Sequence, residues 1–191
     1  MKEQLQKDFD NTIKNLTLSQ KDIEIKKFYL DNFINKGFPN RREEDWKFSD
    51  LNQIIKKNIG EISFYSDYTS TNKVDTSAFV DGLEHNKIVF INGRIEKIDF
   101  DYEKKDQIEI IDQSETINKF NNNSSLSDLN SAFTNKSFKI VVKEGYQLTK
   151  PLIIYHTTNS KIWSKNINLR LNFELYENSS LRLIDLFRDT S

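Results

Sequence analysis

Residues 167–187 read INLRLNFELYENSSLRLIDLF, and the expected fold depends on their pattern. From position 168 to 175, polar residues alternate with leucine or phenylalanine, which is the period of a β-strand with one buried face. Asn178 and Ser179 form a polar turn before the second apolar run at 179–187. The stretch therefore predicts two consecutive strands joined by a short turn.

Short apolar runs also precede this stretch, with FKIVV at 138–142 and PLIIYH at 151–156. Repeated short strands without helices between them are typical of a sandwich, a barrel or a parallel β-solenoid. The segments KEGYQLTKPLIIY and YENSSLRLIDLF look like successive copies of one unit, which favours the solenoid. Solenoids normally need at least about three rungs plus caps, and residues 138–191 would supply about two. We therefore expect the N-terminal part of a longer protein or a natural truncation.

The N-terminal residues 1–37 have the pattern of two antiparallel helices, because apolar residues recur at helical spacing in both halves. The second helix is expected to begin at the sequence Ser19-Gln20-Lys21-Asp22, which resembles a capping box. It is expected to end at Gly37, since glycine readily adopts a left-handed turn, and Pro39 blocks its continuation.

The middle of the chain mixes strand and helix signals. Residues 87–91 and 107–111 read as strands, and Asn92–Gly93 is a strong signal for a hairpin turn. Residues 126–133 predict a short helix, with a cap at one of the two serines that lie at positions 125 and 127.

Composition narrows the function classes. The 28 Lys and Arg residues balance 29 Asp and Glu residues, so the formal net charge is −1 and no nucleic-acid partner is expected. Without cysteine there is no disulfide framework and no thiolate metal site. No signal peptide and no apolar run of roughly 20 residues is evident, so we expect a cytoplasmic protein with no membrane partner.

The segment PNRREEDWKFSDL at 39–51 places aromatic residues within a charge-dense loop. It resembles the Pro-x-Arg-x-x-Glu-x-Trp-Lys-Tyr-Thr-x-Leu motif of SufD-like proteins, which belong to the SufB/SufD family of iron–sulfur cluster assembly proteins. Phe48 and Ser49 depart from that motif, so a hydrogen bond from the usual tyrosine ring is lost. The matching residues are Pro39, Arg41, Glu44, Trp46, Lys47 and Leu51.

Three further segments resemble the same family in the same order. KIVFINGRIEKID at 87–99 is similar to its hairpin, with Asn92 and Gly93 at the turn. LSDLNSAFTNKSFKIVVKEGYQLTKPLIIYH at 126–156 is similar to its helix and the strands that follow. LRLNFELYENSSLRLIDLF at 169–187 looks like its first full β-helix rungs. The four segments cover most of residues 39–187.

The resemblance implies an α+β fold in which an N-terminal helical region leads into a right-handed parallel β-helix, here apparently truncated. On that basis we divide the chain into a helical region at 1–60, a mixed connecting region at 61–137 and the first β-helix rungs at 138–191. The family residues linked to cluster formation would lie downstream of Ser191. No catalytic, cofactor-binding or metal-binding residue can therefore be carried over to this chain.

The resemblance also implies a function. A SufD-like scaffold subunit would pair with a SufB-like subunit and with a SufC-like ATPase, and the iron–sulfur cluster would form only in the complete complex. The chain itself would be neither an enzyme nor a cofactor carrier. A truncated, non-catalytic interaction module remains open, as does a carbohydrate-active β-solenoid, which would need paired carboxylates on the solenoid face.

Individual residues allow a functional and a structural interpretation. Trp46 and Phe48 could dock a partner, but the favoured interpretation is that both rings pack as a clasp between the helical layer and the β-region. Arg41 and Glu44 are then expected to form a local exposed pair, worth at most about 1 kcal/mol. The two histidines, at positions 85 and 156, are expected to be structural or surface residues, since no metal-ligand spacing accompanies them.

Overall fold

The computed structural model describes residues 2–59, 62–65, 79–114, 124–159, 162 and 165–189. The chain divides into two compact units. The first comprises Met1–Ser66, Ser114–Asn135 and Ser164–Leu169, and contains the α-helices. The second comprises Asp67–Gln113, Lys136–Trp163 and Arg170–Ser191, and contains the strands almost in full.

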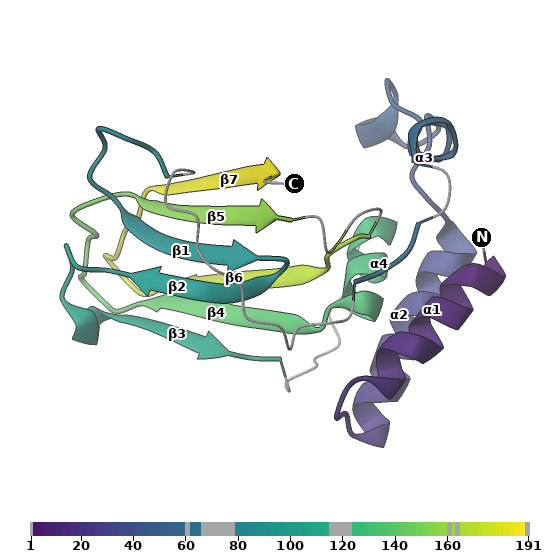
Figure 1. Cartoon of the computed structure of the whole chain (residues 1–191), viewed down its shortest axis with the longest axis horizontal. Helices are drawn as coiled ribbons and strands as arrows, with labels where there is room; N and C mark the ends of the chain where they lie inside the picture. The colour runs from purple at the N-terminus through teal and green to yellow at the C-terminus, as the bar shows by residue number, and fades with distance from the viewer. Residues whose placement is uncertain are drawn as a thin grey trace. The chain divides into compact units, whose positions relative to one another are not determined.

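The first unit is helical. Its first two helices were both predicted from the sequence, and they contribute buried side chains to one core cluster (Figure 1). A short 3₁₀ turn and a third helix follow, and a fourth helix comes from much later in the chain. These elements are α1 (Lys2–Lys14), α2 (Gln20–Lys36), η1 (Glu44–Trp46), α3 (Leu51–Asn58) and α4 (Ser125–Phe133).

The ends of α2 are formed as predicted. The Ser19 hydroxyl accepts a hydrogen bond from the Asp22 amide at 3.2 Å, which satisfies one of the unpaired donors of the first turn. Gly37 has φ +74° and donates its amide to the Phe33 carbonyl. The predicted cap of α4 is wrong, because the capping residue is Ser124 and its side chain makes no capping hydrogen bond.

Aromatic side chains fill the core of the first unit. Phe133, at the end of α4, is 1% exposed. Its ring stacks on Phe64, with centroids 3.6 Å apart, and meets Phe9 edge to face at 6.1 Å. Tyr29 and Phe33 of α2 are fully buried in the same cluster. Helix α4 is therefore packed into the core that the N-terminal helices form.

Two lysines of α2 also hold α4 by electrostatic contacts. The ammonium of Lys26, a residue that is 2% exposed, donates to the backbone carbonyls of Ala132 and Thr134 at the carboxyl end of α4. A cation is stabilised there by the helix dipole and by carbonyls without helical partners. Near the other end of α4, Lys36 pairs with the buried carboxylate of Asp128 at 2.8 Å.

The second unit contains two sheets (Figure 1). The four-stranded sheet has the order β2-β1-β5-β7, and the three-stranded sheet has the order β3-β4-β6. A 3₁₀ turn, η3 (Lys105–Gln107), precedes β3. The strands are β1 (Asn86–Ile91), β2 (Arg94–Asp99), β3 (Ile108–Asp112), β4 (Lys136–Val142), β5 (Leu152–Thr158), β6 (Leu169–Leu175) and β7 (Leu183–Asp189).

The predicted parallel β-helix is wrong. Strand β1 pairs with β5 in parallel and β5 with β7 in parallel, but β1 with β2 and β3 with β4 are antiparallel. The described strands therefore form two sheets that mix parallel and antiparallel pairs. Together with the helices they make a small α+β fold. The prediction failed because period-two alternation specifies a strand and its buried face, but not the direction of its neighbour.

The hairpin predicted at Asn92–Gly93 is confirmed. Both residues have positive φ, at 51° and 81°, as a type I′ turn requires. Residue Asn92 is 2% exposed because it is also tied to the end of β5. Its amide nitrogen donates to the Thr157 carbonyl at 3.0 Å, and its side chain exchanges hydrogen bonds with Asn159. The turn thus joins the β1–β2 hairpin to β5.

We expect Gly93→Ala to lower the free energy of unfolding by about 1–2 kcal/mol, because a Cβ atom is strained at this positive φ. The matched control is Gly93→Asn, since asparagine tolerates the left-handed region and should recover part of the loss. Urea denaturation followed by circular dichroism measures both variants. Equal stability of the alanine variant and the unaltered chain would contradict the prediction.

The two sheets share an apolar core in which Phe90 of β1 contacts Phe138 of β4, with ring centroids 5.7 Å apart. Strand β5 lies at its centre, and residues Leu152–Tyr155 are at most 1% exposed. The apolar residues of β6 were predicted to be buried, but they are only half-buried, and Leu175 is 45% exposed. The core is therefore well covered around β5 and open at β6 and β7.

Candidate functional site

The segment at 39–51 is an exposed loop, and the residues at its two ends belong to the core of the first unit. Phe38 before it is buried against Phe33, with ring centroids 4.9 Å apart, and Pro39 is also buried. At the other end Leu51 packs against the same core, and the Asn52 side chain donates to the Phe38 carbonyl. The ends of the segment are thus held together at its base.

Local hydrogen bonds shape the loop. The Asn40 side chain accepts from the Arg42 amide at 3.0 Å, and the Glu43 carboxylate accepts from the Asn40 amide at 3.2 Å. Arg41 and Glu44 are both exposed, and no ion pair joins these two described residues, so their predicted pairing is wrong. The carboxylate that accepts a hydrogen bond within the loop belongs to Glu43, which is not a residue of the family motif.

The aromatic residues of the loop differ in burial. Trp46 is half-buried, whereas the Phe48 side chain is 91% exposed, with the Lys47 ammonium 6.0 Å from its ring centroid. The prediction that both rings are buried as a packing clasp is therefore wrong for Phe48. An exposed phenylalanine on an ordered loop favours the alternative interpretation, in which the ring contacts a partner.

His85 is buried and makes a hydrogen bond through each ring nitrogen. Nδ1 carries a proton and donates to the Leu83 carbonyl at 2.6 Å, because a carbonyl oxygen can only accept. Nε2 lies 2.7 Å from the hydroxyl of Tyr155, which also accepts from the Val80 amide at 3.0 Å. These hydrogen bonds join the segment before β1 to β5, so His85 has a structural role.

His156 lies in a ladder of rings across the parallel strands. It stacks between Phe90 of β1 and Phe187 of β7, with centroids 5.2 and 4.5 Å away. Its Nε2 lies 2.8 Å from an Asp185 carboxylate oxygen. Burial lowers the pKa of His156, and the Asp185 carboxylate only partly offsets this effect. Nε2 donates to the Asp185 carboxylate, because an ionised carboxylate oxygen can only accept.

Strand β7 presents apolar side chains at the end of the four-stranded sheet. Leu183 and Phe187, on one face of the strand, are 43% and 75% exposed, and Ile184, on the other face, is 39% exposed. We call the edge strand with these three side chains the β7 surface. Within the described strands, β7 has one hydrogen-bonded neighbour, β5. An end strand with exposed apolar residues is a surface on which another polypeptide can pair or pack.

Glu103 is a polar centre that sequence reasoning missed. One carboxylate oxygen accepts from the Asn86 side chain, the Thr149 hydroxyl and the Lys150 amide, at 2.8–3.0 Å. The other accepts from the Tyr146 hydroxyl at 2.8 Å and the Thr149 amide at 3.2 Å. Burial alone would raise the pKa of Glu103, but these hydrogen bonds lower it below its ordinary value. The carboxylate joins the β2–β3 connection to the β4–β5 turn.

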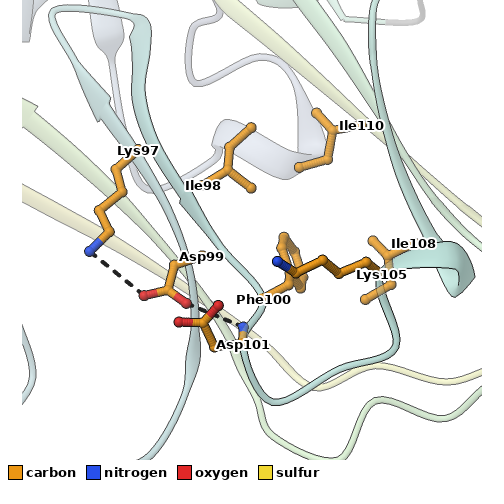
Figure 2. A pocket seen from close by; sticks show the side chains of 8 residues that line it. All are labelled: Lys97, Ile98, Asp99, Phe100, Asp101, Lys105, Ile108 and Ile110. Carbon is orange, nitrogen blue, oxygen red and sulfur yellow. Dashed lines mark hydrogen bonds and ion pairs between the residues drawn. The ribbon is translucent and has the colours of Figure 1, made fainter.

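A pocket of about 470 Å³ lies between the end of β2 and the start of β3 (Figure 2). Apolar side chains and charged side chains both line it. The apolar ones are Ile98, Phe100, Ile108 and Ile110, and the charged ones are Lys97, Asp99, Asp101 and Lys105. Asp99 and Asp101 are separated by one residue in the sequence, and nothing in the local sequence indicates that Lys105 lies beside them.

Among the residues that the structure describes, no group of three or more His, Cys, Asp or Glu side chains could hold a metal ion. None of the helices described there is long and apolar enough to cross a membrane. Comparison with models of protein families and with curated proteins finds no match to this chain.

Proposed function

We propose that this chain is a SufD-like scaffold subunit that works by binding protein partners in iron–sulfur cluster assembly. The observation that carries a binding role is the β7 surface, where three apolar side chains are exposed on an end strand. The ordered resemblance of four segments to the SufB/SufD family supplies the class of partner, namely SufB-like and SufC-like subunits.

The surface suits a protein partner better than a small molecule. Parallel pairing with β5 holds β7 in register along its whole length, from Leu152↔Leu183 to Thr158↔Asp189. A strand ordered in this way can offer backbone donors and acceptors together with side chains, which is how strand addition binds extended polypeptide. Phe187 provides a large aromatic anchor, the kind of residue that dominates interface energies. In this proposal the chain has no catalytic role, and ATP hydrolysis belongs to the SufC-like partner.

Co-expression with SufB-like and SufC-like proteins from the same source tests the proposal. We expect the tagged chain to capture the SufB-like protein, and Phe187→Ser to reduce the recovered amount at least about tenfold, as for an interface anchor. Ile59→Ser is the matched control, because Ile59 is also exposed, at 59%, but lies in the first unit. The Ile59→Ser variant should recover as much SufB-like protein as the unaltered chain does.

Phe48→Ser separates two binding surfaces within this experiment. Loss of capture in this variant, with capture by Phe187→Ser intact, would move the partner contact from β7 to the loop at 39–51. Failure of the unaltered chain to capture either partner would contradict the proposed function.

A further inference from the structure

The pocket between β2 and β3 has the composition of a site for an amphipathic small molecule. Strands β2 and β3 each stand at the end of their own sheet, so the pocket opens where the two sheet edges meet. The Ile98 side chain is 48% exposed within this concave surface, whereas Phe100 is only 9% exposed. The volume of the pocket, about 470 Å³, is within the usual range for small-molecule sites.

The charged residues of the pocket are of two kinds. Asp99 is already paired, because Lys87 and Lys97 lie 3.3 and 3.7 Å from one of its oxygens and the Asp101 amide donates to the other. Asp101 and Lys105 differ from it, since neither has an ion-pair partner among the residues that the structure describes. Figure 2 shows the Lys105 side chain extending toward the side of the pocket where Asp99 and Asp101 lie.

We propose that this pocket binds a free α-amino acid with a large apolar side chain. The apolar side chain would lie against Ile98 and Phe100, the Lys105 ammonium would bind the carboxylate, and the Asp101 carboxylate would bind the ammonium group. The lining carries two lysines and two aspartates, so its formal charge is zero and complements a zwitterion. A simple carboxylate would meet Asp101 without compensation, and a simple amine would meet Lys105.

NMR titration of the ¹⁵N-labelled chain tests the ligand class. We expect L-phenylalanine and L-leucine at millimolar concentration to shift the amides of residues 97–101 and 105–110. N-acetyl-L-phenylalanine lacks the ammonium group and L-phenylalaninamide lacks the carboxylate, so each should bind about fivefold more weakly, as expected for loss of one partly exposed ion pair. Hexanoate is the probe for a simple amphipathic carboxylate.

Two variants assign the charges. Lys105→Met should bind L-phenylalanine about fivefold more weakly and no longer distinguish it from the amide, whereas Asp101→Asn should no longer distinguish it from the N-acetyl compound. The matched controls are Lys104→Met and Asp106→Asn, at neighbouring exposed residues that do not line the pocket. The proposal is overturned if amino acids cause no shifts in these residues, if hexanoate binds more tightly than they do, or if both variants keep the discrimination.

Discussion

Replacing Phe133 with alanine is expected to lower the free energy of unfolding by about 3–5 kcal/mol. The side chain is 1% exposed and contacts two other rings, those of Phe64 and Phe9. Its removal would leave a cavity in the core that holds α4 against the N-terminal helices, and close packing prevents the surroundings from filling it completely. Urea denaturation followed by the helical circular dichroism signal would measure the loss.

Phe48→Ala is the matched control, since it makes the same chemical change in the same unit at a side chain that is 91% exposed. We expect a change within about 0.5 kcal/mol, as for surface substitutions in general. A small loss in both variants would contradict the position of Phe133 in the core, and a large loss in both would contradict the exposure of Phe48. A large loss for Phe48 alone would restore the clasp interpretation of the loop.

The second large effect is expected from Glu103→Gln, which should lower the free energy of unfolding at pH 7 by about 2–3 kcal/mol. The substitution keeps the size of the side chain but removes its charge. It also replaces one acceptor oxygen by an NH₂ group that faces hydrogen-bond donors, whichever way the amide is turned. Asn86, which is fully buried, is among the donors that lose a charged partner.

The effect should depend on pH. Because the pKa of Glu103 is lower in the folded chain than its ordinary value of 4.5, the carboxylate stabilises the fold fully above the unfolded pKa. That contribution is lost as the pH falls through the folded pKa. The difference between Glu103→Gln and the unaltered chain should therefore be largest near neutral pH and should shrink below about pH 4.5.

Glu109→Gln is the control for this experiment. Its carboxylate is half exposed and pairs with Lys143 at 3.3 Å, and an exposed pair contributes at most about 1 kcal/mol. Denaturation at several pH values would compare the two variants. A loss for Glu103→Gln that is no larger than that of Glu109→Gln, or that grows in acid, would show that the hydrogen bonds of Glu103 do not stabilise the fold.

The loop at 39–51 differs from the β7 surface in how its residues are held. Of the motif residues, Pro39 and Leu51 lie at the buried base of the loop, and Arg41, Glu44 and Lys47 are exposed. Exposed residues on a loop with fixed ends are available for a partner and contribute little to the core. We therefore regard the loop at 39–51 as the second surface, after β7, at which a partner should be sought.

The candidate pocket illustrates why sites are harder to predict than elements. Lys97 and Asp99 are close in sequence, but Lys105, Ile108 and Ile110 join them only because the turn after β2 brings β3 back beside them. Each residue taken alone resembles an ordinary surface charge or a core isoleucine. Nothing in its local sequence indicates which distant side chain it will meet.

The sequence by itself determined the features that depend on a few neighbouring residues. Ser19 and Gly37 set the ends of α2, and Asn92–Gly93 set the β1–β2 hairpin, because capping and positive φ are local properties. Short apolar runs, and alternation at 168–175, likewise placed the predicted strands of the C-terminal third near their observed positions.

Only the tertiary structure decided which of these elements are neighbours. Lys26 finds its carbonyl partners 106 and 108 residues away, which brings α4 into the unit of the N-terminal helices. Glu103 finds Tyr146 and Lys150 at separations of 43 and 47 residues. The strands that resembled solenoid rungs divide between two sheets. Hydrophobic periodicity states which face of an element must be buried, but any apolar surface of suitable shape can bury it, so the choice belongs to the packing of the whole chain.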